Sequence, residues 1–124
     1  MGVINTLKKK EFDNIFKNGR FVVDKMMTFY YLPNGTEKKR IGFSVGKKIG
    51  GAVVRNRHKR LMREIYRKHI ESMKPGFDCL IVVRAGSLDE DFRTLEKCFL
   101  RLVKRAKLLK REMNDLEKTG SNGN

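Results

Sequence analysis

The spacing of apolar residues along the chain predicts six regular segments. Three segments carry apolar residues at near-helical spacing, residues 7–18, 52–72 and 92–109. Three others are rich in β-branched and aromatic residues, which is typical of strands, residues 20–32, 40–46 and 77–83. The first of these is one strand, or two joined at Asp24 and Lys25. The order α-β-β(-β)-α-β-α predicts an α+β sandwich of about three helices on a small mixed sheet.

The strand at residues 40–46 alternates between bulky and small side chains. Every second residue from Ile41 to Val45 is apolar and bulky, and we expect this face to be core. Gly42 and Ser44 point the other way. That face of the sheet is therefore predicted to be nearly bare backbone, with room for another chain.

The last helix carries a sequence signature for its start. Ser87 and Glu90 have the spacing of a capping box. The acidic run of residues 89–91 is then explained by the cap and by the favourable helix dipole, so we do not assign it a catalytic role. We expect residues 1–112 to form a single α+β domain and residues 113–124 to be a flexible tail.

The reactive side-chain types are sparse, and each has an ordinary structural explanation. Cys79 and Cys98 lie in apolar stretches and are expected to be buried free thiols, which fits a reducing cytoplasm. His58 and His69 fall on the apolar face of the helix at residues 52–72, where packing explains them better than metal binding. We therefore expect no catalytic residue, metal or cofactor held by the protein itself. A membrane-spanning stretch of ~20 apolar residues is not found.

Charge changes the picture more than any motif of reactive residues. The chain has 29 Lys and Arg against 14 Asp and Glu, a net charge of +15. Residues 38–63 hold ten of the cations and no acid. Like charges repel one another, so this concentration indicates a polyanionic partner.

The helix that follows Gly51 has its cations at the unfavourable end. Arg55 and Arg57 stand near the helix start, where the dipole favours acids. Their placement therefore favours a role in binding. DNA is not expected, because the chain has no clear helix-turn-helix pair, and structured RNA fits better. A ribosomal-type RNA-binding protein and a membrane-surface protein are the alternatives, although the helix has no Trp.

The stretch from Gly42 to Glu64, which includes Lys47-Lys48 and Arg55-Asn56-Arg57, closely resembles the signature of the protein subunit of bacterial ribonuclease P. The resemblance extends over residues 7 to about 110. It implies a non-catalytic protein cofactor that promotes removal of the 5′ leader from precursor tRNA. In this family the RNA subunit supplies the chemistry and uses Mg²⁺. The family fold also implies a left-handed β-α-β crossover.

The resemblance implies two groups of site residues. The first binds the catalytic RNA subunit and comprises Lys47, Lys48, Arg55, Asn56, Arg57, Lys59, Arg60 and Arg63. The second forms a cleft for the single-stranded leader of precursor tRNA and comprises Phe12, Phe16, Tyr30 and Ser44. The i,i+4 spacing of Phe12 and Phe16 predicts core packing equally well, so the residues alone leave both roles open.

Overall fold

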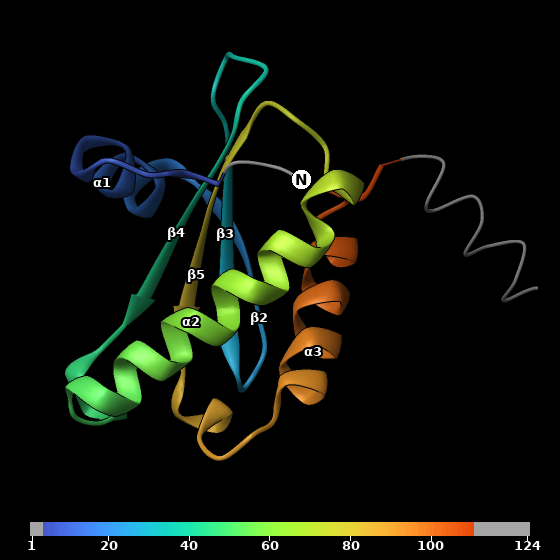
Figure 1. The fold of residues 1–124 in the computed structure, drawn as a ribbon. Helices are drawn as coiled ribbons and strands as arrows, with labels where there is room; N and C mark the ends of the chain where they lie inside the picture. The colour runs from blue at the N-terminus through green and yellow to red at the C-terminus, as the bar shows by residue number, and fades with distance from the viewer. Residues whose placement is uncertain (1–3, 111–124) are drawn as a thin grey trace, which may run out of the picture.

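A computed structural model describes residues 4–110 (Figure 1). The helices are α1 (Lys9–Asn18), α2 (Ala52–His69) and α3 (Phe92–Arg105). The strands are β1 (Asn5–Thr6), β2 (Arg20–Val23), β3 (Met27–Pro33), β4 (Lys39–Val45) and β5 (Phe77–Val83). Residues 20–32 thus form two strands. The predicted flexible tail, residues 113–124, lies outside the described residues.

The five strands form one mixed sheet in the order β1-β4-β5-β3-β2. β4 runs parallel to β5 and to β1, whereas β3 is antiparallel to β5 and β2. This confirms the predicted α+β class of three helices on a small mixed sheet. In Figure 1, β4 and β5 point the same way and α2 crosses in front of them. In this view both strands point down and β5 lies to the right of β4. The β4-α2-β5 crossover is therefore left-handed, the sense that connection rules disfavour.

The main core lies between the sheet and the layer of α2 and α3. Phe29 of β3 and Phe99 of α3 are both 0% exposed, and their rings meet edge to face with centroids 6.1 Å apart. Cys79 and Cys98 are buried free thiols, as predicted. Burial raises the pKa of the Cys98 thiol to about 12. Both thiols are therefore protonated and unreactive at neutral pH.

α2 packs against the sheet and is linked to α3 by charge. Tyr66 is 1% exposed, and its ring meets that of Phe43 of β4 edge to face with centroids 6.4 Å apart. His58 is buried as predicted, with Nδ1 2.9 Å from the Val54 carbonyl oxygen. His69 Nε2 and Lys68 Nζ lie 2.7 and 2.8 Å from the same Oε2 atom of Glu96. Lys68 and His69 hold the pKa of Glu96 below its usual range.

The predicted start of the last helix is wrong. Ser87 belongs to a short 3-10 turn, where its hydroxyl donates to the Arg84 carbonyl oxygen. Asp89 then has a positive φ of 64°, which interrupts any helix at that point. The N-cap is Asp91, whose carboxylate accepts a hydrogen bond from the Thr94 N–H at 2.9 Å.

The helix also ends earlier than the apolar pattern predicts. α3 stops at Arg105, and Lys107 has a φ of 62°. This turn sends Leu108 and Leu109 back into the core, where they are 2% and 3% exposed. The helical spacing of apolar residues extends past Arg105 because Leu108 and Leu109 are buried in the same core as α3, although they are not helical.

Candidate nucleic-acid interface

The start of α2 presents a surface of cations. Asn56, Arg57, Arg60 and Arg63 are exposed, and Arg55 and Lys59 are half-buried. Lys47 and Lys48 are exposed in the 3-10 turn that precedes the helix. These are the eight residues assigned to the RNA subunit, and they follow one another from the 3-10 turn to the middle of α2. We call them the basic surface.

The backbone at this helix end is bare as well as basic. Gly51 is the N-cap, and neither a capping side chain nor an acid satisfies the first turn of α2. A Cβ added at Gly46 or Gly51 would meet no atom within 4 Å. Free N–H groups at a helix start attract anions. The two glycines and the missing cap thus leave the start of α2 accessible to a phosphate group. Arg55 lies close to this backbone, because its Nε donates to the Gly50 carbonyl oxygen at 3.1 Å.

The opposite side of the sheet carries α1 and a cluster of aromatic rings. The Phe16 ring lies 5.4 Å from Phe12 and 5.1 Å from Tyr30, and Tyr30 lies 5.5 Å from Phe21. Phe16 is nonetheless 46% exposed. Phe12 and Phe16 therefore lie outside the main core, and Ile15 is the buried residue of this helix. Core packing, the alternative left open by their spacing, does not describe them.

α1 covers only part of this side of the sheet. One row across the sheet, Val23, Thr28, Val82 and Ser44, has no fully buried member, and Val23 is 43% exposed. We call this row, with Phe16, Phe21 and Tyr30, the open sheet face. Three of the four residues predicted to hold the leader, namely Phe16, Tyr30 and Ser44, lie in it. Phe12 stands beside it on α1.

Gly42 does not contribute bare backbone to this face, contrary to the sequence-based expectation. A Cβ at this position would lie 2.9 Å from Leu7 and 3.3 Å from Leu80. The glycine therefore lets Leu7 close over β4. The room predicted along this strand begins only at Ser44, which is half-buried.

A hollow of about 210 Å³ lies at the edge of β4, between α1 and the basic surface. Phe12 lines it from α1, and Lys59 and Arg63 line it from α2. The Arg63 guanidinium also lies 5.8 Å from the centre of the Phe43 ring. Aromatic and cationic side chains from both layers thus meet at one edge of the sheet.

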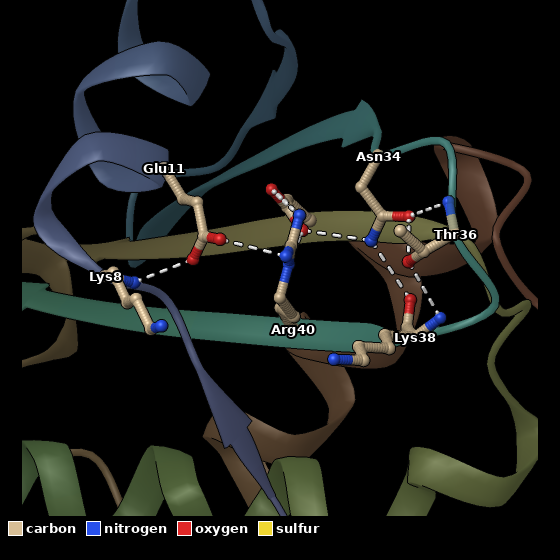
Figure 2. Close-up of polar contacts among 7 residues, drawn as sticks. Lys8, Glu11, Asn34, Thr36, Lys38 and Arg40 are labelled. Carbon is tan, nitrogen blue, oxygen red and sulfur yellow. Dashed lines mark hydrogen bonds and ion pairs between the residues drawn. The ribbon is translucent and has the colours of Figure 1, made fainter.

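Polar contacts fasten the N-terminal end of α1 to the sheet (Figure 2). Arg40 Nη1 lies 2.9 Å from Glu11 Oε2, and Arg40 Nε lies 2.6 Å from Asp78 Oδ1. Asn34 Nδ2 donates to the same Asp78 oxygen at 3.0 Å. The hydrogen bond that Arg40 donates to Asp78 raises the pKa of Arg40. Glu11 also accepts from the Lys8 N–H at 2.9 Å, which caps the helix.

Two exposed apolar residues escaped the sequence analysis. Phe21 is 58% exposed on the open sheet face, and Val53 is 83% exposed beside the basic surface. The alternation of β2 could have indicated a face for Phe21, but only the pairing of Phe21 with Tyr30 places it there. Nothing in the apolar pattern distinguishes Val53 from a core residue.

Other chemistries find little support in the described part of the chain. Among residues 4–110, there is no group of three or more His, Cys, Asp or Glu side chains that could hold a metal ion. Over the same residues, the helices are too short or too polar to cross a membrane.

Comparison with known proteins gives a consistent result. The family model described as Ribonuclease P matches residues 5–107. The ribonuclease P protein component of Natranaerobius thermophilus is 39% identical over 114 residues, which cover 91% of this chain and 99% of that protein. The protein of the same name from Clostridioides difficile is 39% identical over 99 residues, or 79% of this chain and 87% of that protein.

Solved structures agree with the sequence relatives. The RNase P protein of Staphylococcus aureus superposes with a TM-score of 0.79 at 27% identity, covering 88% of this chain and all of that one. That of Thermotoga maritima gives 0.75 at 31% identity, covering 82% and 96%. The resemblance seen in the stretch from Gly42 to Glu64 is thereby confirmed. With its sequence matched from residue 5 to residue 107 and its fold shared, the chain belongs to the ribonuclease P protein family.

Proposed function

We propose that this protein is the protein subunit of a bacterial ribonuclease P and acts in the cytoplasm. It binds the catalytic RNA subunit through the basic surface and the 5′ leader of precursor tRNA on the open sheet face. In this way it promotes the endonucleolytic removal of the leader that gives the mature 5′ end of the tRNA. The RNA subunit carries out the cleavage and uses Mg²⁺.

One observation carries the proposal more than any other. The basic surface begins at the start of α2, where the helix dipole disfavours a cation such as Arg55 and where the first turn holds no compensating acid. Such an arrangement costs stability in the free protein and is offset when phosphates bind. The names of the sequence relatives supply the kind of complex in which this binding takes place.

The open sheet face supports the second part of the proposal. Its exposed rings, Phe16 at 46% and Phe21 at 58%, suit the stacking of unpaired bases. Stacking needs no particular base, so leaders of different sequence would be accepted. In the hollow at the edge of β4, Phe12, which stands beside this face, lies near Lys59 and Arg63.

The decisive test is cleavage of a precursor tRNA at low Mg²⁺ by the protein alone, by the catalytic RNA alone and by both together. We expect efficient cleavage at the 5′ junction only in the mixture, because the bound protein screens phosphate repulsion. Cleavage by the protein alone would place the chemistry in its own side chains. A mixture no faster than the RNA alone would favour the ribosomal-type alternative.

Replacing Phe16 by alanine is expected to weaken binding of leader-bearing precursor tRNA about ten-fold, because a base loses its stacking partner. Binding would be measured with the assembled complex on precursor tRNA and on leaderless tRNA, and only the former should change. Phe92→Ala is the matched control, since Phe92 is a half-buried phenylalanine of α3, in the layer across the sheet. Equal losses for the two RNAs would remove Phe16 from the leader site.

A further inference from the structure

α1 is held against the sheet by few contacts. Of its ten residues, Ile15 is the one that is buried, and it packs near the C-terminal end. A helix of this length is marginal without tertiary packing. Leu7 fixes the chain just before the helix by covering Gly42 and by donating its N–H to the Ile41 carbonyl oxygen at 3.0 Å. Within the N-terminal half of the helix itself, Glu11 supplies an ion pair to the sheet.

The ion pair of Glu11 with Arg40 is supported by further hydrogen bonds within the sheet. Arg40 holds Asp78 through two hydrogen bonds, Nε to Oδ1 at 2.6 Å and Nη2 to Oδ2 at 3.2 Å. Asp78 is 4% exposed, and Asn34 of the turn between β3 and β4 also donates to it. With these bonds fixed, the remaining Nη1 of Arg40 points to Glu11 at 2.9 Å (Figure 2). The Arg40 guanidinium thus connects Asp78 of β5 with Glu11 of α1, and we call this connection the strut.

The strut ends beside the residues that face the leader. Glu11 directly precedes Phe12, whose ring contacts Phe16. A shift of Glu11 away from β4 would therefore move both rings relative to the open sheet face. Partly exposed ion pairs contribute little to stability as a rule, and this pair is 20% and 25% exposed. Its position indicates a role in geometry.

We propose that Glu11 and Arg40 are positioning residues, which set the distance of α1 from the open sheet face and so the fit of the single-stranded leader. This inference rests on the proposed function. Neither residue belongs to the two groups assigned to RNA contact. Their effect on the leader is carried through Phe12 and Phe16.

Two conservative substitutions break the strut without removing its supports. Glu11→Gln keeps an oxygen for the Lys8 N–H but presents an amide N–H to Arg40, so the cap survives and the pair does not. Arg40→Lys leaves a cation beside Asp78, but an ammonium lacks the planar fork that holds two carboxylates. Asp13→Asn is the matched control, because Asp13 is an exposed acid of the same helix.

The measured quantity is the ratio of dissociation constants for leaderless and leader-bearing tRNA, with the assembled complex. Glu11→Gln and Arg40→Lys are each expected to lower this ratio about three- to ten-fold. The double variant should lower it by no more than either single variant, since both break one contact. Affinity for the RNA subunit and for leaderless tRNA should stay as in the wild type, as should everything measured for Asp13→Asn.

An unchanged ratio in Glu11→Gln would overturn the proposal. So would equal losses for leaderless and leader-bearing tRNA, which would indicate general unfolding, or an equal loss in Asp13→Asn, which would indicate charge alone. A wild-type complex with no preference for leader-bearing tRNA would instead overturn the leader site of the proposed function, and the positioning role with it.

Discussion

Replacement of Phe99 by alanine is expected to lower the free energy of unfolding by about 3–5 kcal/mol. Phe99 is 0% exposed, and its ring meets Phe29 edge to face with centroids 6.1 Å apart. Truncation would leave a cavity between the sheet and the layer of α2 and α3. Small domains have a total stability of only about 5–15 kcal/mol. Urea denaturation followed by circular dichroism measures the change directly.

Phe21→Ala provides the matched comparison. The same atoms are removed, but Phe21 is 58% exposed at the open sheet face. We expect its free energy of unfolding to change by less than about 1 kcal/mol, because little buried surface is lost. Similar losses for the two variants would mean that the two sides of the sheet are equally well packed, contrary to their exposure.

The joint replacement of Arg57 and Arg60 by alanine is expected to weaken binding of the catalytic RNA subunit about 100-fold or more near 0.1 M salt. Both side chains are exposed on the basic surface. Each is expected to make a charged hydrogen bond to phosphate, which contributes about 1.5 kcal/mol or more. Each also releases about one counterion, so the slope of log affinity against log salt should fall by about two. Filter binding across a salt series measures both quantities.

The control for this prediction removes the same charge from another helix. Arg93 and Lys97 are exposed cations of α3, and their joint replacement by alanine lowers the net charge equally. We expect a much smaller loss of affinity and a nearly unchanged salt slope. If the two double variants behaved alike, binding would depend on net charge and not on the arrangement at the start of α2.

The regular elements were predictable because their apolar patterns are strong. The segment at residues 77–83 was expected to be a strand, and β5 forms there and pairs with both β4 and β3. The start of α3 was not predictable in the same way. Ser87 and Asp91 are both good N-cap residues, and the choice between them depends on the backbone turn at Asp89, which brings the chain across from β5.

The two proposed sites differ in how much of their composition could be predicted from the sequence. The basic surface lies in one stretch of the chain, so charge counting and helical geometry indicated the stretch, and the resemblance implied its eight residues. The open sheet face is assembled from α1, β2, β3 and β4, and its composition depends on register. The loop at residues 24–26 pairs Val23 with Thr28. A tighter turn would have paired β2 differently and moved Phe21 away from Tyr30. The covering of Gly42 by Leu7 is likewise a tertiary contact without a local signal.

The crossover through α2 has a consequence for how two RNA molecules are held at once. Because α2 connects β4 directly to its neighbour β5, the basic surface is built onto the same strands that form the open sheet face. The pairing of β4 with β5 therefore sets the distance between the basic surface and the strands of the open sheet face. Under the proposed function, a leader would gain affinity only when it is long enough to reach from the cleavage site to the rings of Phe16 and Phe21.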